Sequence, residues 1–220
     1  MRRATGKRQT VRRKTVRRIA THRTPRKEEI LDVAAGLFAE HGYEAVSLLE
    51  IARTVGLSKT TLYHYFESKD EILGTLIVAT IKQLNEFVAS AVPAAASPEE
   101  KLIGFMEAQA DFFENHRTQF KVLLTQFGNL TDPATRDSAV EWRVQYENAI
   151  RSIIQEGVAS GAFSPERPNT VVRAVLASLY WLVRWYQPDG AKKARLLARE
   201  CAELMLYGVA ARSRRASRAA

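Results

Sequence analysis

The stretch from Ser47 to Lys69, with the sequence SLLEIARTVGLSKTTLYHYFESK, limits what this chain can fold into more than any other segment. Ser47 and Glu50 have the spacing of a capping box at the start of one helix. Gly56 permits the tight turn that follows, Ser58 is placed to cap a second, short helix, and Ser68 is placed to cap the longer helix after the motif. This order of helix, turn and short helix is typical of the helix-turn-helix that enters the major groove of duplex DNA. We therefore expect double-stranded DNA to be a partner of the chain.

The spacing of apolar residues predicts helices in the remainder of the chain as well. Apolar side chains recur at three- and four-residue steps, and no region shows the alternation or the β-branched clusters of strands. The predicted fold class is therefore all-α. Proline, glycine and helix-capping residues divide the pattern into segments. The expected helices cover about 27–42, 48–55, 59–65, 69–88, 98–116, 118–128, 134–160, 168–187 and 190–210.

The charge of the chain, +9 in total, is concentrated at its two ends. Residues 1–27 contain twelve Lys and Arg and no acidic residue, and residues 212–220 contain four Arg. The segment 28–211 has seventeen bases and twenty-four acids, so the expected folded part is acidic. A basic arm at 1–25 beside a DNA-reading motif favours contact with phosphates and binding that weakens as salt rises. A solubilising tail and an Arg-rich transit peptide are the alternative interpretations of this arm.

Polar side chains mark the exposed face of the second, short helix of the motif. Its first turn offers an amine and hydroxyl groups to base edges, and its last turn offers a phenol and an imidazole to phosphates. Leu62 and Phe66 are expected to point inward and to hold this helix against the other two. A single polar residue on a helix is more often a solvated surface group, so the prediction of DNA contact rests on these residues taken together. The candidate DNA-contacting residues are Ser47, Ser58, Lys59, Thr60, Thr61, Tyr63, His64 and Lys69.

From about Glu28 to Leu73 the sequence resembles the tetracycline-repressor (TetR) family of bacterial regulators. The resemblance rests on Phe38-x-x-x-Gly42-Tyr43, Ile51-Ala52, Val55-Gly56-Leu57-Ser58-Lys59-Thr60-Thr61-Leu62-Tyr63-His64-Tyr65-Phe66 and Ser68-Lys69-Asp70-Glu71. It implies about nine helices, with a three-helix DNA-binding domain followed by a helical domain for effector binding and homodimerisation. By the family pattern, the residues that contact operator DNA are Ser47, Lys59, Thr60, Tyr63, His64 and Lys69.

The expected domains follow from the motif and the charge pattern. They are a basic arm at 1–25, the helix-turn-helix DNA-binding domain at 26–72, the effector-binding and dimerisation domain at 73–211, and a basic tail at 212–220. The segment PAAASP at 93–98 is expected to be a linker and is a further candidate boundary.

Bulky apolar residues in the second domain are the candidates for an effector site, since ligand pockets are mostly apolar with a few polar anchors. Arg184 lies between two Trp on one predicted helix and is a candidate anchor for a carboxylate or phosphate. This pattern is similar to that of TetR members that sense acyl-CoA thioesters. Core packing, and an ion pair on a dimer face, are the alternatives. The candidate ligand-binding residues are Phe105, Phe112, Phe127, Tyr146, Trp181, Arg184 and Trp185.

The last two predicted helices offer the expected dimer surface, as two helices from each subunit can form a self-complementary four-helix contact. Its expected members are Leu176, Leu179, Val183, Tyr186, Leu197, Cys201, Leu204, Met205 and Gly208.

These observations favour a ligand-responsive transcriptional regulator, in particular a repressor that binds a palindromic operator as a dimer. A small apolar or acyl-CoA-type effector would release it. The alternatives are a ligand-independent architectural DNA binder and an enzyme with a DNA-binding head. An enzyme is not expected, because no nucleophile elbow or phosphate-binding loop occurs. The single Cys201 and the absence of a run of about 18 apolar residues lead us to expect no metal, cofactor or membrane partner and a cytoplasmic location.

Overall fold

The computed structural model describes residues 25–164 and 167–208, and all regular structure within these ranges is helical, which confirms the all-α prediction. The predicted basic arm, apart from Pro25, and the basic tail lie outside the described residues. The elements are α1 (Pro25–His41), α2 (Leu48–Val55), α3 (Lys59–Tyr63), α4 (Lys69–Ala91), α5 (Pro98–Asn115), α6 (Arg117–Gln126), the 3₁₀ helix η1 (Phe127–Asn129), α7 (Pro133–Ala159), α8 (Pro168–Trp185) and α9 (Ala194–Tyr207).

Serine side chains start the helices around the motif, as the sequence predicts. The Oγ of Ser47 accepts the N–H of Glu50 at 3.1 Å, and the Glu50 carboxylate completes the capping box. The Oγ of Ser58 accepts a backbone N–H at the start of α3, and that of Ser68 does so at the start of α4. Gly56 ends α2 with a φ of 75°, a left-handed conformation that residues with a Cβ rarely adopt. These caps fix the turn angles within the motif.

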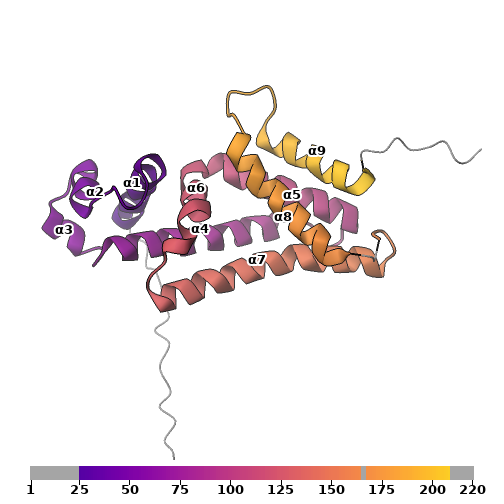
Figure 1. Ribbon diagram of the computed structural model, residues 1–220, viewed down its shortest axis with the longest axis horizontal. Helices are drawn as coiled ribbons and strands as arrows, with labels where there is room; N and C mark the ends of the chain where they lie inside the picture. The colour runs from indigo at the N-terminus through magenta and orange to yellow at the C-terminus, as the bar shows by residue number, and fades with distance from the viewer. Residues whose placement is uncertain (1–24, 165–166, 209–220) are drawn as a thin grey trace, which may run out of the picture.

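The first three helices form a small unit, which we call the head, and its buried residues are continuous with the apolar core of the other helices. Ile30, Phe38 and Ile51 are buried at its centre, and Leu62 and Phe66 point inward as expected. Helix α3 ends at Tyr63, two residues earlier than predicted, because the N–H groups of the next two residues bond to carbonyls three residues back. The head occupies one end of the molecule, shown in indigo and violet in Figure 1.

Helix α4 joins the head to the remaining helices, which we call the body (Figure 1). It packs against α1 in the head and against α5, α6 and α7 in the body. A Cβ at Gly74 would lie 2.6 Å from Cγ2 of Thr135, so the missing side chain permits the close approach of α4 to the first turn of α7. Among the described helices, α4 alone is long and apolar enough for a membrane span, but half of its most apolar stretch is buried, as in an ordinary core helix.

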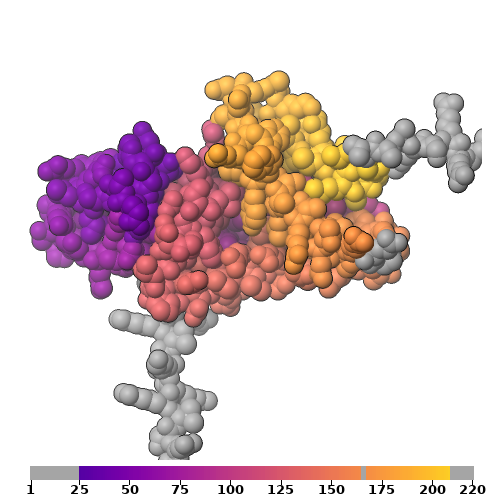
Figure 2. Space-filling model, in the orientation of Figure 1, coloured from indigo at the N-terminus to yellow at the C-terminus, as the bar shows by residue number. Residues whose placement is uncertain are grey.

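Helix α5 is the central helix of the body and contacts α4, α7, α8 and α9. Helix α9 lies close to it, because Ala194, Ala198 and Ala202 recur every four residues and turn small side chains toward α5. Next to this contact, the buried carboxylate of Glu107 on α5 accepts hydrogen bonds from Arg195 and Arg199 on α9. Figure 2 shows α7, α8 and α9 covering much of one face of the body, with α7 extending back toward the head.

A second polar contact holds the start of α9. The carboxylate of Glu114 on α5 accepts hydrogen bonds from the Tyr186 hydroxyl at 2.7 Å and the Ala194 N–H at 3.3 Å, and Lys193 pairs with it. Burial opposes ionisation of this carboxyl, but these hydrogen bonds outweigh it and lower its pKa below the ordinary value.

Two expectations for the last helices differ from the structure. Helix α9 begins at Ala194 and not near residue 190, since Pro188 and Gly190 lie in a turn. Leu179 and Tyr186 are buried within the subunit, so their assignment to a dimer surface is wrong. The aromatics that α8 exposes are instead Tyr180, Trp181 and Trp185.

Candidate DNA-binding surface and effector domain

Helix α3 presents four polar side chains to solvent on the head. Lys59, Thr60, Tyr63 and His64 are all exposed, with Tyr63 at 46% of its full accessibility. The Lys59 ammonium lies 5.8 Å from the centre of the Tyr63 ring, and no other partner of these four side chains occurs among the described residues. This face can offer one amine, two hydroxyl groups and one imidazole to a duplex.

The other residues of the predicted DNA-contacting set have structural partners. The Ser58 Oγ accepts the Thr61 N–H at 3.0 Å and lies 2.8 Å from the Thr61 Oγ1, so both hydroxyl groups belong to the cap of α3. Ser47 is exposed, but its hydroxyl accepts the Glu50 N–H in the cap of α2. These hydroxyl groups therefore help to position α2 and α3. Each can still form a hydrogen bond to a phosphate, but only with the lone pair or O–H that the cap does not use.

Lys69 is held inside the head in a way that the sequence did not indicate. Its ammonium donates to the backbone carbonyl of Tyr43 at 2.8 Å and lies 4.2 Å from the centre of the Tyr43 ring. The Tyr43 hydroxyl donates to Asp70, the neighbour of Lys69. Burial, and then this carboxylate, raise the pKa of Tyr43 well above its ordinary value, so the hydroxyl remains a donor. Tyr43 and Lys69 thereby attach the start of α4 to the loop before α2.

Contacts between the head and the body lie beside this attachment. The second oxygen of Asp70 accepts the hydroxyl of Thr131, in the segment before α7, at 3.2 Å. On α6, Lys121 donates to the Ala39 carbonyl at 2.7 Å and Gln119 donates to Asp32 at 3.0 Å. Helix α6 and the segment that follows it therefore connect the body to α1 and to the start of α4.

The candidate effector residues fall into separate groups. Phe105 and Tyr146 are buried together in the body, with ring centres 5.1 Å apart, and Phe112 is buried further along α5 beside Phe120. Phe127 is half-buried in η1, under the guanidinium of Arg143 at 4.9 Å.

The remaining candidates lie on the outer face of α8. Trp181 is 65% exposed and Trp185 is 47% exposed, with the exposed Arg184 between them. The structure does not bring these three residues together with the buried aromatics. An anchor role for Arg184 would therefore require a ligand on the outside of α8.

A groove of about 450 Å³ runs between α4 and α7. Phe105 and Tyr146 form part of its wall, and Val88, Val92 and Ile153 add apolar surface. Asn85, Glu86 and Gln145 contribute polar groups, and no Lys or Arg among the described residues lines it. Two of the predicted effector residues thus share one apolar groove.

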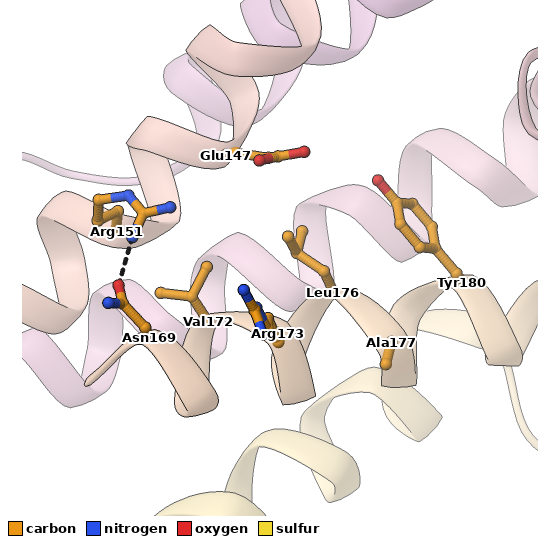
Figure 3. Close-up of a pocket in the computed structure, with 8 residues that line it drawn as sticks. All are labelled: Glu147, Arg151, Asn169, Val172, Arg173, Leu176, Ala177 and Tyr180. Carbon is orange, nitrogen blue, oxygen red and sulfur yellow. Dashed lines mark hydrogen bonds between the residues drawn. The ribbon is translucent and has the colours of Figure 1, made fainter. Parts of the chain in front are cut away.

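A second groove, of about 520 Å³, lies between α7 and α8 (Figure 3). Arg151 donates to Asn169 at its one end, and Glu147 extends toward the end where Tyr180 lies. Arg173 lies between them, beside the apolar Val172 and Leu176. None of the polar residues of this groove was predicted as a site residue, because their spacing on the predicted helices is that of an ordinary solvated surface, and Leu176 was expected on the dimer surface instead. In the described part of the chain, no group of three His, Cys, Asp or Glu side chains is arranged to hold a metal ion.

The exposed α3, its caps and the helical body together define a helix-turn-helix DNA-binding regulator. Residues 30–76 match the family described as bacterial regulatory proteins, tetR family, and residues 95–209 match the tetracyclin repressor-like, C-terminal domain. The chain therefore belongs to the TetR family of transcriptional regulators. Since this family and the relatives below are regulators, the expectation that the chain is not an enzyme is confirmed.

Three similar proteins illustrate the range of the match. The transcriptional repressor KstR2 of Mycolicibacterium smegmatis is 28% identical over 84% of this chain and 90% of its own length. The structure of the TetR family regulator PfmR from Thermus thermophilus is 38% identical over 83% of this chain and 99% of its own, with a TM-score of 0.77. AibR, solved in complex with isovaleryl coenzyme A and operator DNA, is 24% identical over 81% of this chain and 97% of its own, with a TM-score of 0.75, a likeness of fold.

Proposed function

We propose that the protein is a ligand-responsive repressor that binds a palindromic operator as a homodimer and is released by a small apolar or acyl-CoA-type effector. The domains would be the arm at 1–25, the DNA-binding domain at 26–72, the effector-binding and dimerisation domain at 73–211 and the tail at 212–220. A DNA-binding role also implies that the protein acts in the cytoplasm.

The observation that carries the proposal is the face of α3. Lys59, Thr60, Tyr63 and His64 are exposed and without strong partners in the described structure, whereas Leu62 on the same helix is buried. A short, rigidly held helix with free polar side chains on one face suits entry into the major groove. The remaining candidates, Ser47, Ser58, Thr61 and Lys69, would add phosphate contacts at the edges of this face.

Exposed apolar residues on α8 and α9 support dimerisation. Trp181 and Trp185 on α8, and Leu204 and Tyr207 on α9, are between 47% and 65% exposed. Large exposed aromatics of this kind are enriched in protein interfaces. Two copies joined here would place two α3 helices on half-sites about 34–36 Å apart, or more on a longer operator.

The effector class is supported by the body and by the relatives. The α4–α7 groove offers apolar walls for an acyl chain or a ring system, and the α7–α8 groove offers Arg151 and Arg173 to an anionic group. KstR2 of Mycobacterium tuberculosis, named a ketosteroid transcriptional regulator, and AibR, solved with isovaleryl coenzyme A, have this fold. An apolar effector with an acyl-thioester group fits both the lining of the two grooves and the ligands named for these relatives.

DNA binding is tested with the full chain and the DNA upstream of its own gene, by fluorescence anisotropy. Tyr63→Phe removes one exposed hydroxyl, and we expect affinity to fall about tenfold on all sequences, as for a lost phosphate contact. Tyr180→Phe, on α8 and far from α3, is the matched control and should bind DNA as the wild type does when no effector is present. Full affinity in both Tyr63→Phe and Lys59→Ala would contradict the assignment of α3.

Release and dimerisation have separate tests. Octanoyl-CoA added to the protein–DNA complex should lower binding, and unchanged binding with a wide panel of acyl-CoA and steroid compounds would favour the architectural alternative. Light scattering should give twice the subunit mass of 24.7 kDa, and Trp181→Glu should shift the protein toward monomer. A monomeric wild type at micromolar concentration would contradict the dimer.

A further inference from the structure

A polar pair lies buried inside the body, where the neighbouring side chains are aromatic. Gln109 on α5 is 1% exposed and Tyr146 on α7 is 2% exposed. The Tyr146 hydroxyl donates a hydrogen bond to the Oε1 of Gln109. Phe105, one turn before Gln109, stacks at a tilt against the Tyr146 ring. This pair is the only side-chain hydrogen bond between α5 and α7 that has both partners buried within the described residues.

The hydrogen bond leaves part of the Gln109 amide unsatisfied. The amide nitrogen carries two N–H groups, and no acceptor for them occurs in the described part of the chain. Exchanging the amide oxygen and nitrogen does not remove the problem, because an oxygen would then lack its donor. A buried polar group without a partner destabilises a fold, so such groups are rare and call for an explanation.

The position of the pair connects it to a space that a ligand can reach. The Tyr146 ring and Phe105 line the α4–α7 groove, whereas Gln109, which is bonded to Tyr146, is buried and does not line it. A ligand in the groove reaches the Gln109 amide only if the wall formed by these rings opens. Burial raises the pKa of the Tyr146 hydroxyl well above its ordinary value, and the nearby Tyr180 adds to this effect. The hydroxyl therefore remains protonated and continues to occupy the amide oxygen, which leaves the amide N–H groups for another acceptor.

We propose that the Gln109 amide, positioned by Tyr146, binds the carbonyl oxygen of an effector whose apolar part occupies the α4–α7 groove. The inference rests on the proposed effector-released function and specifies the group that is recognised. A neutral carbonyl fits better than a carboxylate, because no described Lys or Arg lines the groove, and Lys82, one turn away on α4, is already paired with Glu86. The thioester carbonyl of an acyl-CoA satisfies this requirement, with its charged part outside the groove.

The test compares two compounds that differ in this carbonyl alone. Octanoyl-CoA and its thioether analogue S-octyl-CoA are titrated into the full chain by calorimetry, and their release of operator DNA is measured in parallel. The wild type should bind the thioester at least tenfold more tightly. Gln109→Leu, of similar volume, should bind both compounds equally. Its melting temperature is measured in parallel, because the change removes the unsatisfied N–H groups but also leaves the buried Tyr146 hydroxyl without its acceptor.

Controls separate recognition from folding and from the wider function. Gln155→Leu, the same change at an exposed position on α7, should keep the thioester preference. Gln109→Met replaces Gln109→Leu if the Leu variant is unstable. The comparison of the two compounds on the wild type does not depend on the stability of any variant. Equal binding of both compounds by the wild type, or a preference kept in Gln109→Leu, would overturn the carbonyl assignment while release by octanoyl-CoA stands. If neither compound binds or releases DNA, the acyl effector is wrong and the inference fails with it.

Discussion

The contact between Glu107 and two arginines of α9 allows a quantitative prediction. Glu107 is 4% exposed, and its carboxylate accepts hydrogen bonds from Arg195 at 2.8 Å and from Arg199. Glu107→Gln keeps the shape of the side chain but removes its charge. Removing one partner of a fully buried ion pair costs about 3–5 kcal/mol, and an exposed pair is worth at most about 1 kcal/mol.

The exposure of the two guanidinium groups decides whether the cost of losing the Glu107 charge is closer to that of a buried or of an exposed ion pair. The side chains of Arg195 and Arg199 are 56% and 46% exposed, so both remain solvated when the carboxylate is lost. We therefore expect Glu107→Gln to lower the free energy of unfolding by about 2 kcal/mol. At about 2–4 °C per kcal/mol for a chain of this size, Tm should fall by about 4–8 °C.

Circular dichroism at 222 nm, at one fixed protein concentration, measures this change. Glu203→Gln is the matched control, because Glu203 pairs with Arg199 at 3.9 Å on the exposed face of α9. It should lower Tm by no more than about 2 °C. A Glu107→Gln protein that melts within about 1 °C of the control would refute the view that this carboxylate holds α9 to α5.

Three further predictions concern DNA binding and pH. Thr60→Ala should change the relative affinities among operator variants, measured by competition anisotropy, if Thr60 reads bases; equal losses on every variant would indicate a phosphate contact instead. Deleting residues 1–23 should reduce the slope of log affinity against log salt, and an unchanged slope would show that the arm does not contact DNA. The pKa of Glu114 is lowered in the folded protein, so its stabilisation is present above the unfolded pKa and is lost as pH falls through the folded value. In urea titrations, the free energies of unfolding of the wild type and Glu114→Gln should differ at pH 7 and become similar below pH 4.5. The same difference in free energy at both pH values would exclude this linkage.

Local features of the fold could be predicted because their signals are local. Ser47, Ser58 and Ser68 cap helices where the sequence indicated, and Gly56 has the left-handed conformation that its turn requires. The early end of α3 could not be predicted, since it depends on 3₁₀-type bonding that the residue pattern does not specify.

The site could be predicted only in part, because its contacts join residues far apart in the chain. Apolar spacing places α3 and its exposed face, but it does not show that Lys69 bonds the carbonyl of Tyr43, 26 residues away. Gln109 and Tyr146 are 37 residues apart, and nothing in the sequence near either residue indicates the other. Tyr180, Trp181 and Trp185 lie on α8 and Tyr186 follows it, and spacing alone did not show that Tyr186 would be the buried one of these four.

Helix α4 also links the α4–α7 groove to the head in one continuous element. Its 23 residues form one uninterrupted rod, about 34 Å long at 1.5 Å per residue. Val88, near one end, lines the α4–α7 groove, and Lys69, at the other, is attached to the loop that carries the head. A tilt of about 5° about the groove end would move the far end by about 3 Å, close to the rise of one base pair. A small tilt of α4 at its groove end would thus be enough to displace each reading helix by about the distance between neighbouring base pairs, and spin labels at Lys59 of two subunits would report the change in their separation.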